Sequence, residues 1–358
     1  MNRRIAIPLA LLVLAGCMVV PIVSDVSDAA EQSFYGSQLD GNGTAVFDAL
    51  ETLRGNYQNT VTIDVPFDLE GSTIHDSSES AVIKAESVVA DALAAKYYSE
   101  PLIPHLWDLP VSSPEVTVKV TSITLSGNSG TYYYASSVSV VLTVPEDMMD
   151  DPSTTDKNEL EQRMDQVKNA VKDVSATGSN TAEKVKSIVN GLSGIKTVDD
   201  EEGTVSNIYD ALVEKKSSSI GISSAFTSCC MLKGIDAVSV RGQLYDGTES
   251  SVHHWNAVLC DGVWYGVDAD LGKHSKSYIM AGSLTQLDAA GSTFGGTHVA
   301  DLDMSEENGL VAPGITRDAY QYPDDTPFFE KYGAYIILAA IILVICVAMF
   351  RATRDDGH

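Results

Sequence analysis

Two short segments late in the chain carry histidines and carboxylates at a spacing that could support acid–base chemistry. Residues 252–260 and 263–269 have the composition of two strands, and Asp261-Gly262 between them is a strong signal for a two-residue hairpin turn. The first strand contains His253-His254, and the second ends at Asp268 and Asp270. The hairpin therefore predicts that imidazole and carboxylate groups lie side by side.

The register of this hairpin decides which side chains meet. A two-residue turn pairs Cys260 with Val263, Leu259 with Trp264, Ala257 with Gly266, Trp255 with Asp268, and His253 with Asp270. Because side chains alternate between faces, we expect His253 to share a face with both carboxylates, and His254 to lie on the other face. A carboxylate beside an imidazole orients the ring and stabilises its protonated form, as in a catalytic triad. Structural ion pairs have the same arrangement, so the pair alone does not establish catalysis.

A triad also needs a nucleophile, and a helix N-terminus is the favoured place for one. The small-residue helix predicted for 220–232 is preceded by three serines, Ser217-Ser218-Ser219. Free N–H groups and the helix dipole stabilise negative charge at such a position. Serines at that position also cap helices, and the residues alone favour the cap.

These segments resemble transglutaminase-like proteins, which have a papain-like fold. The resemblance is carried by Ser219 to Phe226, by Gly234-Ile235, by His253-His254-Trp255-Asn256, and by Asp261-Gly262-Val263-Trp264-Tyr265-Gly266-Val267-Asp268. It covers about residues 181–278 and extends more weakly to the segments before them. It implies a catalytic set of Ser219, His253 and Asp268, which selects Asp268 over Asp270. It implies no cofactor, and no spacing in the chain suggests zinc.

One departure from the family pattern bears directly on function. In register, Ser219 stands where these proteins carry the nucleophilic cysteine. A cysteine in such a site can be ionised in advance, whereas a serine must lose its proton as it attacks. We therefore expect a catalytically impaired binding or scaffold module for peptides or cell-envelope polymers. The alternative is an active acyl-transfer or peptide-hydrolysing enzyme that uses Ser219, His253 and Asp268.

Other residues of the region have weaker assignments. We expect Trp255, Asp270 and Gly221 to contact the substrate or ligand, and we expect no metal ligands. Cys229 and Cys230 lie about 15 Å along the same helix, so they are poorly placed to replace the nucleophile.

The elements that must position these residues indicate an α+β fold. Helical spacing at 45–57, 79–98, 158–174 and 181–192 comes with a hairpin at 116–144 and antiparallel strands after residue 237. We predict an N-terminal α+β region at 31–152 and a transglutaminase-like domain at 153–325, in which a helix packs on an antiparallel sheet.

Both ends of the chain indicate export and membrane attachment. Residues 1–30 read as a signal peptide or signal anchor, and the segment ending at Cys17 also resembles a lipidation site. Residues 332–350 are almost wholly apolar and are followed by Arg351 and Arg354, which predicts a transmembrane helix with a cytoplasmic tail at 351–358. We therefore expect a single-pass membrane protein whose bulk is extracellular.

The charge composition argues against nucleic acid as a partner. The chain has 23 Lys and Arg against 49 Asp and Glu, a formal net charge of −26. Such a surface repels phosphates, so we expect no nucleic-acid binding. Its five cysteines do not suggest a disulfide framework, because two of them lie in the terminal apolar segments.

Overall fold

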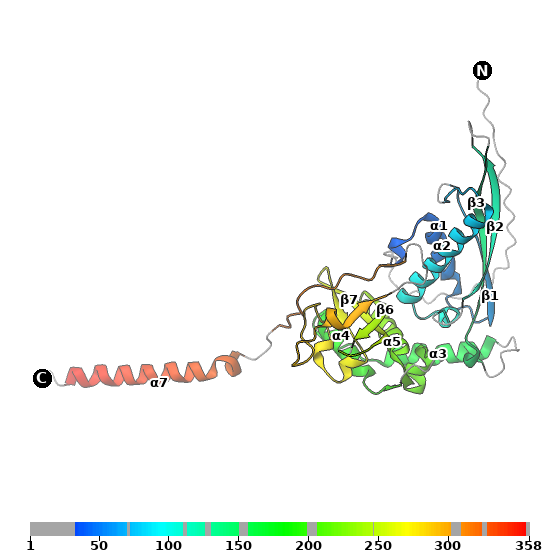
Figure 1. The fold of residues 1–358 in the computed structure, drawn as a ribbon. Coiled ribbons are helices and arrows are strands. Elements are labelled where there is room, and N and C mark those ends of the chain that lie inside the picture. The colour runs from blue at the N-terminus through cyan, green and yellow to red at the C-terminus, as the bar shows by residue number, and fades with distance from the viewer. Residues whose placement is uncertain are drawn as a thin grey trace, which may run out of the picture.

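The structure is a computed structural model that describes residues 33–69, 72–109, 113–125, 130–149, 157–198, 206–245, 247–301, 309–323 and 328–355. The predicted signal segment and the lipidation motif at Cys17 lie outside the described residues. The described part is mixed α and β, as predicted, with two separate antiparallel sheets and helices around them (Figure 1).

The N-terminal region pairs two helices with a three-stranded sheet. The helices are α1 (Gly41–Ala49) and α2 (Ser78–Ser99), and the strands are β1 (Thr60–Pro66), β2 (Glu115–Thr124) and β3 (Thr131–Thr143) in the order β1-β3-β2. The predicted hairpin at 116–144 is confirmed as β2 and β3. Strand β1 was not predicted, although its side chains alternate strictly between exposed and buried.

The second region contains the predicted hairpin and the helices around it. Its helices are α3 (Lys157–Asp173), α4 (Thr181–Leu192) and α5 (Ser219–Leu232), with a π-helical turn at Asp210–Glu214 and a short parallel pair of β4 (Lys196–Thr197) and β5 (Lys216–Ser217). A four-stranded sheet follows, with strand order β8-β7-β6-β9. Its strands are β6 (Ala237–Tyr245), β7 (Ser250–Cys260), β8 (Val263–Val267) and β9 (His298–Ala300), and the short helix α6 (Phe294–Thr297) precedes β9.

This sheet lies between two hydrophobic cores. On one face, Val258 and Val267 pack with helices α3, α4 and α5 in one core. On the other face, Val240 and Ala257 join the core of α1, α2 and the first sheet. The Tyr35 hydroxyl donates to Ser239 O at 2.9 Å across this junction. The N-terminal region therefore forms the second cover of the sheet that carries the site.

Helix α7 (Phe328–Asp355) extends away from the rest of the molecule (Figure 1). Its described side chains include several exposed aliphatic residues, such as Ile337, Leu343 and Val344. Among the described residues, no helix combines the length and apolarity needed to cross a membrane. The membrane span expected for 332–350 stays a prediction.

Candidate active site

The β7–β8 hairpin has the predicted turn and register. Asp261 and Gly262 both have positive φ, 53° and 79°, which a two-residue turn of this kind requires. The strands pair Cys260 with Val263 and continue in register to Asn256 with Val267. Strand β8 ends there, because the chain turns at Asp268. Asp270 consequently does not pair across from His253 as the extended register predicted.

Asp268 lies at the centre of the site and is fully buried. Its Oδ1 accepts hydrogen bonds from the backbone N–H groups of Asp270 and Leu271, both at 2.9 Å. Its Oδ2 lies 2.7 Å from His253 Nε2 and 3.2 Å from His298 Nε2. Burial alone would raise the pKa of Asp268, but the two histidines outweigh burial and hold that pKa well below its usual range. Asp268 is therefore an ionised carboxylate shared by two imidazoles.

The structure brings His253 to the predicted carboxylate. Its Nε2 is directed to Asp268, so proton transfer to or from a substrate would use Nδ1. The Trp255 ring stacks beside His253 with a centroid separation of 6.5 Å, and meets the His298 ring edge-on at 5.2 Å. Both histidines and Trp255 are buried. Trp255 thus packs against both imidazoles and holds their orientation.

Ser219 begins helix α5 and meets strand β7 beside His253. Its hydroxyl accepts a hydrogen bond from the backbone N–H of His254 at 3.1 Å. Within the described part of the chain, that hydroxyl makes no hydrogen bond to the His253 ring. The helix start and the histidine strand are therefore adjacent, as predicted, but the serine and the imidazole are not joined.

Ser219 is also the first member of a stripe of hydroxyl groups along α5. Ser223 Oγ, four residues later, donates to Trp255 O at 2.8 Å, and Asn256 Nδ2 donates to Ser223 Oγ at 3.1 Å. Thr227, four residues further, accepts from Asn256 Nδ2 at 2.9 Å. Residues four apart lie on one helix face, so this hydroxyl stripe of Ser219, Ser223 and Thr227 attaches α5 to β7.

His254 lies on the α5 face of the sheet, as predicted, and is unsuited to acid–base work. Both of its ring nitrogens are buried and have no hydrogen-bond partner among the described residues. Burial, followed by the nearby charges of His253 and Arg241, lowers the pKa of His254 to about 3. Its ring is therefore neutral at physiological pH.

Two residues predicted to contact a ligand, Asp270 and Gly221, make close contacts within the protein. Asp270 Oδ1 lies 2.8 Å from Lys273 Nζ, in a buried ion pair, and accepts from the Thr197 hydroxyl. A Cβ added to Gly221 would lie 2.1 Å from Ser217 Oγ and 2.5 Å from Asn207 O. Asp270 thus holds Lys273 and the β4 strand, and Gly221 allows close packing of α5.

Cys229 and Cys230 are not alternative nucleophiles. Both thiols are buried, and burial raises the pKa of Cys229 to about 12 and that of Cys230 well above its usual value. A protonated buried thiol is unreactive.

His298 was missed by the sequence analysis. It lies 30 positions after Asp268 on β9, which pairs with β6 at the end of the sheet. Its ring stacks on Phe294 with centroids 4.1 Å apart, and its Nδ1 lies 2.8 Å from Thr297 Oγ1 and 3.2 Å from Phe294 O. No motif marks this histidine, and only the pairing of β9 with β6 brings it to Asp268.

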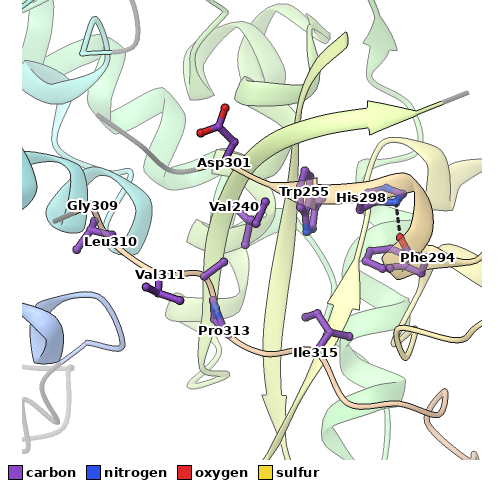
Figure 2. Close-up of a pocket in the computed structure, with 13 residues that line it drawn as sticks. Val240, Trp255, Phe294, His298, Asp301, Gly309, Leu310, Val311, Pro313 and Ile315 are labelled. Atoms are coloured by element: carbon purple, nitrogen blue, oxygen red, sulfur yellow. Dashed lines mark hydrogen bonds between the residues drawn. The ribbon is translucent and has the colours of Figure 1, made fainter. Parts of the chain in front are cut away.

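A cavity of about 550 Å³ opens beside this pair of histidines (Figure 2). Trp255, Phe294 and His298 line it from the sheet side, and residues 309–313 line the opposite side. Gln38 holds this second wall, because its side chain exchanges two hydrogen bonds of 2.9 Å with the backbone of Val311. The cavity therefore gives a ligand access to the Trp255 and His298 side of the site.

Comparison with known proteins agrees with the geometry. Residues 168–269 match the family model of the transglutaminase-like superfamily. No curated protein matches the chain.

Two solved structures were also found, at low overall similarity. One is described as the crystal structure of a TGase and is 15% identical, with a TM-score of 0.28. The match covers 58% of the present chain and 50% of the TGase chain, so the present chain spans about half the length of that TGase. The other is a putative cysteine protease from Cytophaga hutchinsonii, 12% identical, with a TM-score of 0.28 over 60% of this chain and 80% of its own.

Proposed function

We propose, from the premise that residues 168–269 form a transglutaminase-like domain, that the protein is a catalytically impaired module that binds a peptide or cell-envelope polymer. The observation that carries this proposal is that a serine, whose hydroxyl accepts a hydrogen bond from His254 N–H, begins α5 beside the His253–Asp268 pair, where related proteins carry a cysteine. The cysteine of such a site can be ionised in advance, whereas an unactivated serine hydroxyl is a weak nucleophile. Ser219 instead has the same role as Ser223 and Thr227, which join α5 to β7.

The cavity supports binding of an extended ligand. It is lined by Trp255 and Phe294 on one side and by Val311 and Pro313 on the other, and it also reaches the polar groups of His298 and Asp301 (Figure 2). Apolar walls with a few polar groups are typical of ligand sites. The ligand would lie along the sheet face that carries His253 rather than on the α5 face.

A serine-directed fluorophosphonate probe tests the catalytic part of this proposal. We expect no labelling of the full chain beyond that of Ser219→Ala, because an unactivated hydroxyl is a weak nucleophile. Labelling that disappears in Ser219→Ala and in His253→Ala would overturn the proposal. It would favour the second candidate, acyl transfer or hydrolysis by Ser219, His253 and Asp268, for which the His253–Asp268 pair is the supporting observation.

Binding is tested with a matched pair of surface variants. Val311 lines the cavity and is 68% exposed, whereas Leu284 is 52% exposed and lies outside the cavity lining. We expect Val311→Glu to weaken binding of an extended peptide library or of solubilised envelope polymer at least tenfold, and Leu284→Glu to leave it unchanged. Equal effects of the two variants, or no binding by the unmodified chain, would contradict a ligand in this cavity.

We further propose that residues 332–350 attach the protein to a membrane, with the bulk of the chain outside and residues 351–358 inside. The support is the apolar sequence and the arginines that follow it. Alkaline carbonate extraction should leave the full chain with membranes and release a chain that ends at Pro323. Release of both chains would contradict the attachment.

A further inference from the structure

Three buried side chains at the site are arranged as a set of metal-ligating groups. One nitrogen each from His253 and His298 and one oxygen from Asp268 all lie within 4.8 Å of one another. The side chains of His298 and Asp268 are fully buried, and that of His253 is 9% exposed. Clusters of acidic groups on protein surfaces are common without a metal, but these three side chains are buried and two of them are histidines.

The donor set matches a particular class of ion. Two imidazoles and one carboxylate suit divalent first-row transition metals, and three protein ligands with one open position are typical of catalytic zinc sites. Ligands about 2.0–2.1 Å from a tetrahedral zinc ion lie roughly 3.3 Å from each other. The two nitrogen–oxygen distances here are 2.7 Å and 3.2 Å, and all three ligand atoms lie within 4.8 Å of one another, so ligation would need the two imidazole rings to move closer together.

The groups around the three side chains hold them in the orientation that ligation needs. The backbone N–H groups of Asp270 and Leu271 occupy Asp268 Oδ1 and direct Oδ2 toward the histidines. The Nδ1 of His298 faces the carbonyl oxygen of Phe294, which can only accept a hydrogen bond. The Thr297 hydroxyl, 2.8 Å from the same Nδ1, can donate or accept, so both neighbours are compatible with a proton on Nδ1, which would leave Nε2 a lone pair directed at the Asp268 carboxylate. Metal-ligating histidines commonly make such a bond to a backbone carbonyl through their other nitrogen.

In that tautomer two electron-rich atoms, His298 Nε2 and Asp268 Oδ2, face each other, which creates a need for a positive group between them. A metal ion can meet it for both histidines at once, because both Nε2 atoms face the same Asp268 oxygen.

We propose that His253 Nε2, His298 Nε2 and Asp268 Oδ2 bind one divalent transition-metal ion, for which zinc is the best match. A fourth ligand comes from solvent or from a molecule in the cavity that His298 lines (Figure 2). The proposal does not depend on the binding of a peptide or envelope polymer, because its ligands all belong to this chain. The proposal gives a role to His298, which is not part of the family pattern described above.

Titration of the untagged, full chain with zinc chloride after chelator treatment tests the proposal. Isothermal titration should show one site per chain, and His298→Ala should weaken that site at least tenfold. His274→Ala is the matched control, because His274 is exposed and has no part in the cluster, and it should leave the affinity unchanged. Equal zinc affinity in the unmodified chain and in His298→Ala would overturn the proposal.

A second measurement uses the unmodified chain, in case His298→Ala does not fold. One equivalent of cobalt(II) chloride should broaden or shift the NMR signals of the His253 and His298 ring protons before those of other histidines. It should also produce a visible absorption band that excess zinc chloride removes. A chain that shows neither effect holds a hydrogen-bonded His–Asp–His group without a metal, which contradicts the proposal.

Discussion

The Ser219 hydroxyl accepts a hydrogen bond of 3.1 Å from the backbone N–H of His254, the residue directly after the histidine that is paired with Asp268. The serine is thus close in space to a correctly built His–Asp pair, and yet it is bonded to the strand backbone. Accepting this bond leaves the hydroxyl proton free, so the proposed impairment rests on the weak nucleophilicity of a serine beside the His–Asp pair.

The hydroxyl stripe on α5 should contribute to stability where its members are hydrogen-bonded. Ser223 is buried, donates to Trp255 O and accepts from Asn256 Nδ2, so Ser223→Ala removes two buried hydrogen bonds. We expect a loss of about 1–3 kcal/mol in the free energy of unfolding, measured by chemical denaturation. Ser228 is the matched control on the same helix, because its buried hydroxyl has no partner among the described residues. Ser228→Ala should be neutral or stabilising, and a larger loss there than at Ser223 would contradict the stripe.

Close packing under the start of α5 should make Gly221 sensitive to a single methyl group. The added Cβ of Gly221→Ala would overlap Ser217 Oγ and the backbone oxygen of Asn207. We expect destabilisation of about 1–3 kcal/mol, since an overpacked core forces backbone shifts. Gly41→Ala in helix α1, where an added Cβ meets nothing within 4 Å, should not destabilise the protein. Comparable thermal stability of the two variants would exclude the packing role.

The Asp270–Lys273 pair should behave as a buried structural ion pair. The Asp270 side chain is 9% exposed and that of Lys273 is 4% exposed, so Asp270→Ala leaves a buried ammonium group uncompensated. We expect a loss of about 3–5 kcal/mol in unfolding free energy. In Asp301→Ala the pair broken is Asp301–Arg241, which is partly exposed, and the loss should be about 1 kcal/mol or less. If Asp270→Ala has the same unfolding free energy as the unmodified chain and weakens only ligand binding, Asp270 contacts the ligand and does not stabilise the fold.

His105 should make stability depend on pH in the N-terminal region. Burial lowers the pKa of His105 below 6.5, despite the opposing hydrogen bond to Gln58 O. Between its folded pKa and about 6.5 the unfolded chain therefore binds more protons, so stability rises with pH across this window. His105→Gln keeps an N–H donor but does not titrate.

We expect the unmodified chain to have a steeper rise than His105→Gln, by up to about 1.4 kcal/mol per pH unit. Urea denaturation at several pH values from about 5 to 7, the range in which a histidine titrates, measures this difference. Identical slopes would show that His105 is protonated equally in the folded and unfolded states.

Much of the site could be predicted because its geometry is local. The Asp261-Gly262 turn fixes the hairpin register, and the register places His253 on the face that carries Asp268. The paired position of Asp270 was predicted wrongly, because strand β8 ends at Val267 and the Asp268 carboxylate accepts the next backbone N–H groups. The alternation of residues along a strand predicts which side chains share a face. It does not predict the residue at which the strand ends.

The remaining features depend on contacts between distant segments. His298 reaches Asp268 only because β9 pairs with β6, and β9 is a three-residue strand with no pattern of its own. The tight contact of Gly221 likewise depends on Asn207, which lies in a separate turn. Strand β1 is a different case, since its alternation was present in the sequence and was missed.

The most direct test of the account is the reactivity of a thiol placed at residue 219. In Ser219→Cys freed of metal by a chelator, the new thiol lies at the start of α5 near His253, whose ring is held by Asp268, so the pKa of the thiol should fall below the usual value of about 8.5. Alkylation by iodoacetamide at mildly acidic pH should be at least tenfold faster than in the variant that also carries His253→Ala. Ser223→Cys, one turn further into the buried helix, should not react, and Cys229 and Cys230 should stay unmodified in all variants. A thiol at residue 219 that reacts no faster with His253 present than without it would contradict the claim that a functional His–Asp pair lies beside an inert serine.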